Sequence, residues 1–515
     1  MRFYLTTPIY YVNSTPHIGH AYTTIAGDIL VRHHRQRGDE TYFLTGVDEH
    51  ADKVARVAAE QGLNPREYTD RIVVAWQELP RRLNATNDFF IRTSDEGHIR
   101  FTQDFLQRIY DNGQDDIYQD VYAGLYCYGC EAFKTEEELV DGKCPDHGTE
   151  PEWIEERNWF FRLSAYQESL LRLYDDRPDF VLPHFRSNEA RSFIEGGLRD
   201  FSISRATQTW GVPIPWDPDQ VAYVWADALV NYLSALSYAP RGDSDKPESP
   251  DAPGESLERF WPAVHFLAKD ILRFHCVYWP AMLLAACYEP PRQLFVHGYL
   301  NIDRQKISKS LGIAVDPLDL IDTYGVDALR FWCARQVSFG QDGDVALASV
   351  GERYEKELAN DLGNLVSRTT AMISRYRDGR LAKTPGPGVF DADALRESVV
   401  AHLDRYDITG ALDEIWQAVR KLNQHVESSA PWEIAKDEAR AAELDAVLYD
   451  LADGLVAVAV ALSPYLTETA PRILDALGQS ADLALDRVRS QVAEAAEGIA
   501  PSPPLFPRID APAPA

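Results

Sequence analysis

The first fifty residues restrict the fold more than any other stretch, because a strand, a loop, a helix and a second strand follow one another directly. Residues 2–12 are aromatic and β-branched, as in a buried strand, and Asn13-Ser14-Thr15-Pro16 interrupts them. Residues 18–37 have a helical pattern closed by Gly38, and residues 41–46 form the second strand. Strands joined through a helix run in the same direction, so this order predicts a parallel sheet.

An insertion is predicted to split this sheet. Residues 116–200 break the pattern with short strands and aromatic-rich turns, whereas residues 222–238 resume it as strand to helix, and residues 263–300 as helix then strand. From about residue 350 the pattern is helical, with Leu358, Leu362 and Leu365 on one face. We predict an α/β fold in six segments: a first half-sheet (1–115), an insertion (116–200), a second half-sheet (201–300), a connecting region (301–350), an all-α domain (351–495) and a Pro/Ala-rich tail that frays (496–515).

Composition indicates a globular chain of several domains. The 515 residues exceed one ordinary domain, and 45% hydrophobic with 25% charged residues is typical of folded proteins. No apolar run approaches the roughly 18 residues that a membrane span needs, and the N-terminus lacks an apolar signal segment. These observations predict a cytoplasmic protein without a membrane partner.

The net charge argues against a general nucleic-acid binder. Lys and Arg number 51 against 80 Asp and Glu, which gives a formal charge of −29, whereas phosphate contacts need cations. Net charge does not exclude a local basic track. If this chain binds RNA, we expect such a track, with recognition by shape and base stacking.

The loop after the first strand predicts a phosphate site. It reads Pro16-His17-Ile18-Gly19-His20 and opens a helix, whose free N–H groups and dipole attract phosphate. Gly19 leaves room for a flat base on bare backbone, and histidines three residues apart can both donate to phosphate oxygens. The alternative is a loop with two surface histidines.

A second candidate element lies much further along the chain. Lys306-Ile307-Ser308-Lys309-Ser310 follows a strand and a turn, and its lysines and serines could close over a triphosphate and stabilise charge as pyrophosphate departs. The alternative is a solvated basic loop. The order of the two elements on a split parallel sheet favours the nucleotide interpretation.

Three cysteines and a histidine predict a zinc site. Cys127-x2-Cys130 and Cys144-x2-His147 have the spacing of two knuckles that build a tetrahedral site, and Gly129, Gly142 and Gly148 allow tight turns. Four protein ligands leave no open position, so this Zn²⁺ would be structural. The remaining cysteines are expected to be buried and apolar: Cys276, Cys287 and Cys333.

The two candidate nucleotide elements resemble the HIGH and KMSKS signatures of class I aminoacyl-tRNA synthetases. Further segments resemble the methionyl-tRNA synthetase family in particular, and the resemblance runs from about residue 1 to 480. These segments are Thr7-Pro8-Ile9-Tyr10-Tyr11-Val12-Asn13, Thr45-Gly46-Val47-Asp48-Glu49-His50, Val224-Trp225-Ala226-Asp227-Ala228, His265-Phe266-Leu267-Ala268-Lys269-Asp270-Ile271, Trp279-Pro280-Ala281-Met282-Leu283 and Asp361-Leu362-Gly363-Asn364-Leu365.

The resemblance implies a fold and a reaction. The fold would be a Rossmann-type parallel-sheet catalytic domain, split by a zinc-containing insertion and followed by an all-α anticodon-binding bundle. The enzyme would use Mg-ATP to convert L-methionine to methionyl-adenylate and would transfer the methionyl group to tRNA-Met. Catalysis would be positioning and electrostatics. The resemblance assigns catalytic roles to His17, His20, Lys306, Lys309, Asp48 and Arg205, and ATP binding to Asn13, His17, Gly19, His20, Asp270, Lys306, Ser308 and Lys309.

The family pattern also implies a methionine pocket with an acidic anchor. A thioether packs well against aromatic edges, and Asp48 at a strand end is well placed to hold the α-ammonium group. The alternatives are ordinary core aromatics and a surface salt bridge. The pocket residues would be Ile9, Tyr11, Asp48, Trp225, Ala228, Leu229, Tyr232, Ile271 and His275.

Three residues of the helical domain match family positions that read the CAU anticodon. Asn364 and Arg368 share a helix face, and Trp432 begins another helix. Splayed bases stack on aromatic rings and bond to amide or guanidinium groups. Alone, Trp432 would be interpreted as a helix staple.

Departures from the common family pattern leave rivals open. They occur at Ala51, Ala268, Arg304, Ile307 and Ile313, and none removes a named charged group. One rival is a divergent paralogue that activates methionine or an analogue outside translation, or an inhibitor-resistant isozyme. Another is a catalytically silent tRNA-binding module. No dimerising extension follows the helical domain, so we expect a monomer.

Overall fold

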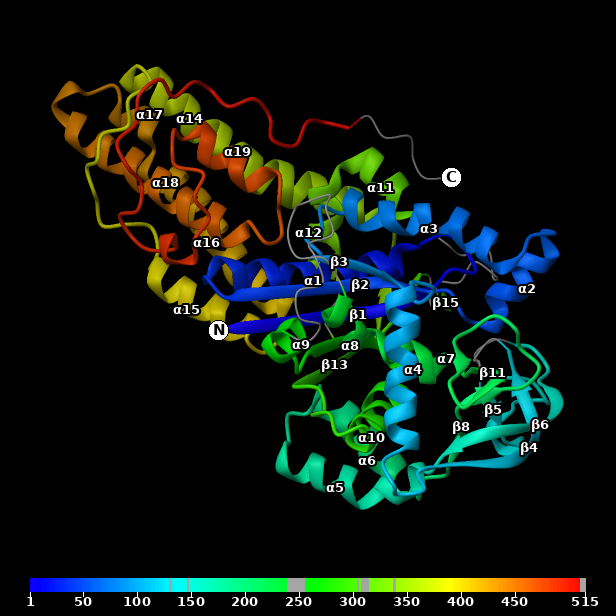
Figure 1. Cartoon of the computed structure of the whole chain (residues 1–515). Coiled ribbons are helices and arrows are strands. Elements are labelled where there is room, and N and C mark those ends of the chain that lie inside the picture. Colours follow the sequence, from blue (N-terminus) through cyan, green and yellow to red (C-terminus); the bar gives the residue numbers. More distant parts are fainter. Residues whose placement is uncertain are drawn as a thin grey trace.

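The computed structural model describes residues 1–128, 132–145, 148–238, 255–302, 305–306, 315–336 and 340–509. Figure 1 shows an elongated molecule with the sheet at its centre, the helical domain at one end and the inserted strands at the other. Among the described residues, no helix has both the length and the apolar character needed to cross a bilayer.

Six parallel strands form the central sheet in the order β3-β2-β1-β12-β13-β7. The first β-α-β unit is as predicted: α1 connects β1 to β2. The predicted split is also confirmed, because Leu5 of β1 lies beside Val264 of β12. The chain therefore builds outward from β1 in one direction and from β12 in the other, and such a reversal leaves a crevice at the carboxyl ends of the strands. The bounds are β1 Arg2–Tyr11, α1 Ile18–Gln36, β2 Glu40–Asp48, β3 Phe89–Arg92, β7 Val181–Leu182, β12 Val264–Ala268 and β13 Gln293–His297.

Two predicted elements differ from the structure. Residues 263–300 begin with strand β12 rather than a helix, and residues 222–238 form two short helices after strand β11. Strand β12 is a short, mostly buried run, and such a run has no periodicity that separates strand from helix. The elements here are β11 Asp217–Ala222, α7 Val224–Ala228, α8 Asn231–Tyr238, α9 Glu255–Phe260, η3 Lys269–Ile271, η4 Phe274–Tyr278 (a π-helix) and α10 Trp279–Ala285.

The inserted region is an antiparallel sheet ordered β5-β4-β6-β8, with a small sheet β10-β11-β9 beside it. Within residues 116–200, strand β7 pairs with β13 and so returns to the central sheet. The bounds are β4 Ile117–Cys127, β5 Ala132–Lys134, η1 Glu136–Glu138, β6 Glu152–Phe161, η2 Leu163–Tyr166, α5 Gln167–Asp176, α6 His184–Glu195, β8 Phe201–Ser202, β9 Ser204–Arg205 and β10 Pro213–Ile214. Helices α2 Asp52–Glu60, α3 Pro65–Arg82 and α4 Glu96–Tyr110 flank the first half of the central sheet.

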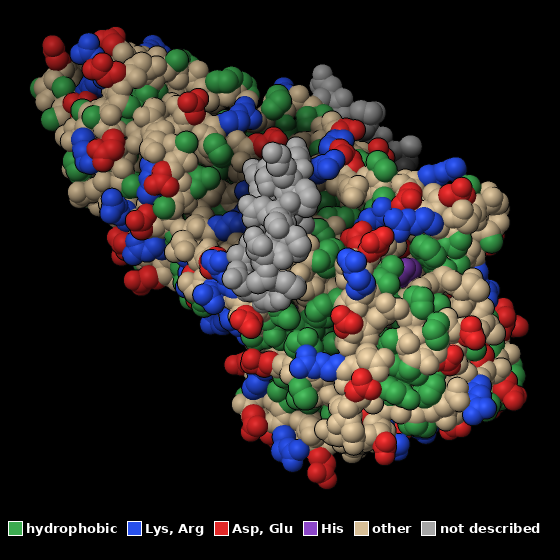
Figure 2. Space-filling model, in the orientation of Figure 1, with side chains coloured by type: hydrophobic (Ala, Val, Ile, Leu, Met, Phe, Trp, Pro, Cys, Tyr) green, Lys and Arg blue, Asp and Glu red, His purple; other side chains and the backbone are tan. Residues whose placement is uncertain are grey.

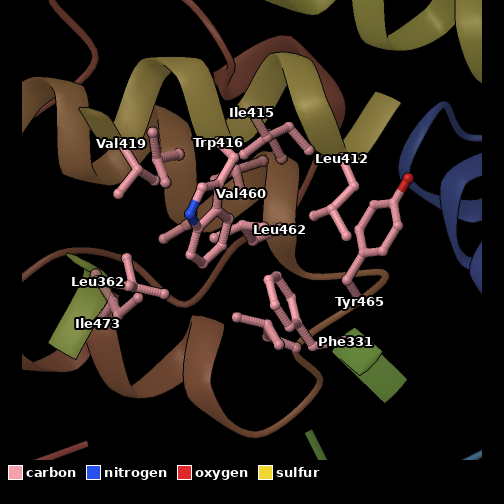
Figure 3. Close-up of a cluster of buried hydrophobic side chains, with 14 of the residues drawn as sticks. Phe331, Leu362, Leu412, Ile415, Trp416, Val419, Val460, Leu462, Tyr465 and Ile473 are labelled. Atoms are coloured by element: carbon pink, nitrogen blue, oxygen red, sulfur yellow. The ribbon is translucent and has the colours of Figure 1, made fainter. Parts of the chain in front are cut away.

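The C-terminal region is helical, as predicted. Trp416 is fully buried in its core, and Figure 3 shows Phe331 of α12 packed below it together with aliphatic side chains from several helices. Leu358, Leu362 and Leu365 are all buried, as their spacing predicts. The elements from residue 300 on are β14 Leu300–Ile302, β15 Gln305–Lys306, α11 Pro317–Tyr324, α12 Val326–Gln336, β16 Gly343–Val345, α13 Ala348–Arg353, η6 Tyr354–Gly363 (a π-helix), α14 Asn364–Arg377, α15 Ala392–Leu403, α16 Ile408–Ser429, α17 Pro431–Ile434, η7 Glu438–Arg440, α18 Ala441–Leu462, α19 Thr469–Ala476 and η8 Leu485–Arg487.

The end of the chain packs on the helical domain, although the sequence predicts that residues 496–515 fray. Leu505 and Phe506 are buried, and the Tyr354 hydroxyl donates to the carbonyl of Pro507 at 2.7 Å. Residues 510–515 lie outside the described residues. Composition rich in proline disfavours helix and sheet, but it does not prevent apolar side chains from docking.

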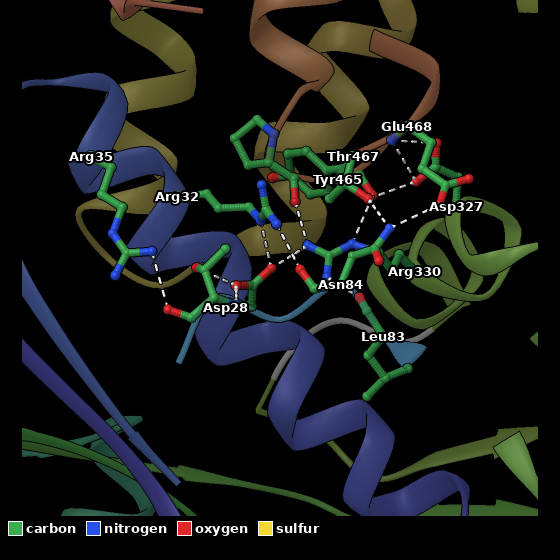
Figure 4. Close-up of polar contacts among 12 residues, drawn as sticks. Asp28, Arg32, Arg35, Leu83, Asn84, Asp327, Arg330, Tyr465, Thr467 and Glu468 are labelled. Atoms are coloured by element: carbon green, nitrogen blue, oxygen red, sulfur yellow. Dashed lines mark hydrogen bonds and ion pairs between the residues drawn. The ribbon is translucent and has the colours of Figure 1, made fainter. Parts of the chain in front are cut away.

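A fully buried arginine joins the helical domain to the central sheet. Arg330 of α12 forms an ion pair with Asp28 of α1 at 2.7 Å and donates to the carbonyls of Leu83, Pro464 and Tyr465 (Figure 4). Burial alone would raise the pKa of Asp28, but the neighbouring arginines lower it below its usual range. The pair is therefore charged and links three segments distant in sequence.

Replacing Arg330 with leucine should lower the free energy of unfolding by about 3–5 kcal/mol, because it leaves the Asp28 carboxylate buried without its main partner. Urea unfolding followed by circular dichroism measures the change. The matched control is Arg37→Ala, since Arg37 pairs with Asp404 at 2.5 Å between the same two parts of the chain but on the surface. That variant should lose less than about 1 kcal/mol. Equal losses in the two variants would contradict the assignment of Arg330 as the main link.

Candidate functional site

The start of helix α1 has an unusual cap built by two histidines. His17 is the N-cap, and its Nδ1 accepts the Gly19 N–H at 3.1 Å, while Nδ1 of His20 accepts the His17 N–H at 3.1 Å. Acceptance at Nδ1 places the ring proton on Nε2, so both half-buried rings are hydrogen-bond donors at that atom. A Cβ at residue 19 would approach the His17 ring to 3.0 Å, so a larger residue would require the ring to shift by a few tenths of an ångström. The helix terminus suits an anion.

The described chain on either side of the second predicted nucleotide element contacts this helix. The Ile18 N–H donates to the carbonyl of Val315 at 3.1 Å. At the other end of the segment, Thr23 of α1 lies 3.0 Å from Nε2 of His297, the last residue of β13. Lys306 is in β15, opposite Asn301 of β14. The side chain of Lys306 and residues 307–314, which include Ser308, Lys309, Ile307 and Ile313, lie outside the described residues, as does Arg304.

The predicted acidic anchor lies at the crevice. Asp48 ends β2, is 2% exposed, and is the register partner of Tyr11 at the end of β1. The His50 N–H donates to Oδ1 of Asp48 at 3.3 Å. Nearby, the Lys53 ammonium lies 3.2 Å from the centre of the Tyr11 ring. A carboxylate and aromatic edges thus meet at the carboxyl ends of neighbouring strands.

Predicted pocket residues gather around the Trp225 ring. Trp225 stacks on Phe274 with ring centres 4.1 Å apart, and Tyr11 and His275 meet it edge-on at 6.3 and 5.9 Å. Phe274 was not predicted, and the signal available for it was its place next to His275 in an aromatic run. Phe274 and His275 lie on the π-helix η4, a form of helix often found at functional sites. Ala228 and Leu229 are buried, whereas Ile9 and Ile271 are half-buried.

Two of the predicted pocket residues form a neutral polar pair. Tyr232 and Nε2 of His275 are 2.7 Å apart, and Nδ1 of His275 is 3.1 Å from the carbonyl of Ile271. The carbonyl can only accept, so Nδ1 carries the ring proton and the Tyr232 hydroxyl donates to Nε2. Burial lowers the pKa of His275 to about 4 and raises that of Tyr232, so both are uncharged near pH 7. An uncharged aromatic pocket suits a thioether.

The remaining predicted catalytic residue, Arg205, and the predicted ATP-binding residues Asp270 and Asn13 lie within the described residues. Arg205 is buried, with its guanidinium carbon 4.1 Å from the centre of the Tyr223 ring, and donates to the carbonyl of Ser204 at 2.7 Å. Asp270 is exposed on η3, and its charge partly offsets the lowering of the His297 pKa by burial. Asn13 is exposed in the loop before α1. Their roles stay predictions.

Half of the predicted zinc ligands can be placed. Cys127 and Cys144 are both buried, and Gly142 and Gly148 have φ of +76° and +65°, as the predicted knuckle turns require. Cys130, His147 and Gly129 lie outside the described residues, within which no group of three or more metal-binding side chains is found. Cys276 and Cys333 are buried as predicted. Cys287 is exposed, which corrects its assignment as buried, and it follows α10 in a left-handed turn with φ of 58°.

In the helical domain, two predicted base-reading residues are in contact. The Arg368 guanidinium lies 5.8 Å from the Trp432 ring centre and pairs with Glu427 at 2.7 Å. Asn364 is exposed one turn before Arg368, and Trp432 is half-buried. Figure 2 shows Lys and Arg interspersed with Asp and Glu across the visible face, so its described part has no continuous basic track.

A family model described as tRNA synthetases class I (M) matches residues 3–150 and 138–370. This match agrees with the split parallel sheet and with a helix N-terminus at its crevice that is suited to bind phosphate. Fold and site therefore define a class I tRNA synthetase.

Relatives refine this class. The chain is 42% identical to the methionine–tRNA ligase of Caldanaerobacter subterraneus subsp. tengcongensis, over 99% of this chain and 79% of that protein. It is also 42% identical to that of Streptomyces coelicolor, over 93% and 90%. A structure of Mycobacterium tuberculosis methionyl-tRNA synthetase bound by methionyl-adenylate superposes with a TM-score of 0.90 at 39% identity, over 98% of this chain and 100% of that one. The chain belongs to the methionyl-tRNA synthetase family.

Proposed function

We propose that this chain is a methionine–tRNA ligase, which activates L-methionine with ATP and transfers it to tRNA-Met. The observation that carries the proposal is the contact between Ile18 and Val315, because it joins the start of helix α1, which carries the first predicted nucleotide element, to the chain that follows the second. The aromatic pocket and Asp48 lie at the same edge of the sheet. The named relatives support this function over a paralogue outside translation and over a silent tRNA-binding module.

In the first step, a methionine carboxylate oxygen attacks the α-phosphate of ATP, and pyrophosphate leaves. Asp48 would hold the α-ammonium group, which aligns the carboxylate for attack. Donors at the start of α1, including Nε2–H of His17 and His20, would stabilise charge on the phosphates. The other groups proposed here are Asn13, Gly19, Asp270, Lys306, Ser308 and Lys309, and Mg²⁺ bound with ATP would neutralise phosphate charge.

Selection of methionine rests on shape and polarity. Trp225, Phe274 and Tyr11 offer aromatic surface, and the neutral pair Tyr232–His275 adds a polar edge near the sulfur without an ionic penalty. A side chain that differs by one methylene is disfavoured by about 1–3 kcal/mol in such a pocket.

In the second step, the 2′-hydroxyl of the terminal tRNA adenosine attacks the methionyl carbonyl, and AMP leaves. Arg205 is proposed to support the activated state from the border of the insertion. At the far end of the molecule, Asn364, Arg368 and Trp432 are proposed to read the CAU anticodon by hydrogen bonding and stacking. We further propose that the enzyme is a cytoplasmic monomer.

Zinc is proposed to shape the insertion. Cys127, Cys130, Cys144 and His147 would hold it, since three thiolates and an imidazole are a donor set that Zn²⁺ prefers. With every ligand supplied by protein, the ion would stabilise the fold and would take no part in the reaction.

Methionine-dependent exchange of pyrophosphate into ATP tests the proposed function, and Asp48→Asn tests its anchor. The wild-type enzyme should show exchange. The variant should raise the KM for methionine by about 10- to 150-fold, because it loses a charged hydrogen bond worth about 1.5–3 kcal/mol, and the KM for ATP should not change. Asp52→Asn is the control, since Asp52 pairs with Arg56 on helix α2. Absence of wild-type exchange would refute the activity.

Trp432→Ala should reduce kcat/KM for tRNA-Met charging by about 5- to 150-fold, because one stacked base contributes about 1–3 kcal/mol. Pyrophosphate exchange should not change, since it needs no tRNA. Trp432→Phe keeps a ring for stacking and should retain most charging. If Trp432→Ala charged tRNA normally, Trp432 would be a helix staple only.

The purified chain should contain about one zinc ion, measured by atomic emission. Cys144→Ser should lose most of the metal and lower the midpoint of thermal unfolding. Cys287→Ser is the matched control, because that thiol is exposed and outside the proposed ligand set, and it should keep its zinc. Equal metal content in both variants would exclude this ligand set.

A further inference from the structure

A buried carboxylate next to the methionine pocket bridges two buried histidines. Asp227 lies on α7 between Trp225 and Ala228 in sequence. Its Oδ2 is 2.6 Å from Nδ1 of His50, and its Oδ1 is 2.7 Å from Nε2 of His98. None of these side chains is more than 4% exposed. The mechanism above uses none of the three.

The cluster connects elements from opposite ends of the first 240 residues. His50 follows strand β2, His98 lies on α4, and Nδ1 of His98 is 2.7 Å from the hydroxyl of Ser234 on α8, the helix that carries Tyr232. A single carboxylate therefore holds α7 to the end of β2 and to α4, which in turn contacts α8.

The same cluster reaches the proposed ammonium anchor through the backbone. The His50 N–H donates to Oδ1 of Asp48, and the Glu49 N–H donates to the Thr93 hydroxyl at 2.9 Å. Trp210 donates its indole N–H to the carbonyl of Glu49. The turn that carries Asp48 is thus fixed on several sides, and the ring of His50 is its link to α7.

Charge strengthens this link. Burial alone would raise the pKa of Asp227, but His50 and His98 lower it to about 2. The carboxylate is therefore ionised across the working pH range, and hydrogen bonds to an ionised acceptor are about twice as strong as neutral ones.

We propose that Asp227, through His50 and His98, is a positioning residue that sets the distance between the Asp48 anchor and the pocket wall on α7. This inference rests on the proposed function, in which the amino acid spans these two points. By fixing this distance, the cluster would select amino acids by the length of their side chains. Discrimination of one methylene requires both ends of the site to be held within about 0.5 Å, and α7 is too short to supply that rigidity alone.

The test is Asp227→Asn, which keeps the side-chain shape but removes the charge and one acceptor. The KM for methionine in pyrophosphate exchange should rise about 10-fold, as expected for about 1.4 kcal/mol, with the KM for ATP unchanged. The preference for methionine over ethionine, which is one methylene longer, should fall by about the same factor. Asp116→Asn is the matched control, since Asp116 is equally buried and accepts from Tyr166 at 2.7 Å and Asn112 at 2.6 Å. It should lower thermal stability without changing the preference.

A second pair of variants separates positioning from folding. Asparagine places its amide nitrogen near the position of Nδ1, so His50→Asn should restore the bond to Asp227 and keep the preference for methionine, whereas His50→Leu should lose it. Equal preference in these two variants, or an Asp227→Asn enzyme with the wild-type preference, would overturn the proposal. If the wild-type enzyme shows no exchange, the proposed function fails instead. Calorimetric titration with methionine then decides on Asp227, with weaker binding expected for Asp227→Asn and equal binding contradicting it.

Discussion

The buried ion pair between Arg330 and Asp28 fixes helix α1 against the helical domain, and the rest of the site depends on where α1 lies. The N-terminus of this helix carries His17 and His20, and its middle carries Asp28. Movement of α12 against α1 would separate Arg330 from its carboxylate and from three carbonyls. The proposed phosphate end and the proposed anticodon end of the molecule are therefore parts of one frame.

Within that frame, charge and neutrality are sharply divided. The Trp225 ring has Phe274 and His275 as neighbours, and burial keeps His275 deprotonated and Tyr232 protonated. Two carboxyl groups stand at the edge of the pocket: Asp48 at the end of β2 and Asp227 behind α7. This division matches an amino acid whose side chain is apolar and whose backbone is charged. The net charge of −29 does not prevent the binding of anionic substrates, because helix termini and a few hydrogen-bond donors act locally.

The sequence predicted the elements and contacts that depend on residues close together in the chain or on recognisable motifs. The first β-α-β unit, the buried leucines of η6 and α14, and the pocket aromatics follow from periodicity and from motif resemblance. Strand β12 could not be predicted in this way, since a short and mostly buried run has no period that distinguishes strand from helix. The docking of the tail through Phe506 depends on packing partners that are distant in sequence. The cluster of His50, His98 and Asp227 could not be predicted, because nothing in the sequence shows that three such separated residues meet. The contact of Phe274 with Trp225 could not be predicted either, because Phe274 lies on a π-helix and no residue propensity indicates that form of helix.

Hydrogen–deuterium exchange with a non-hydrolysable methionyl-adenylate analogue tests the central claim, that two distant segments form one site at the start of α1. Binding should slow amide exchange together in the loop and helix start at residues 13–20, in the turn at 48–51, in α7 and η4, and in the segment 305–316. Protection confined to one of these regions, or appearing mainly in the helical domain, would contradict a shared site.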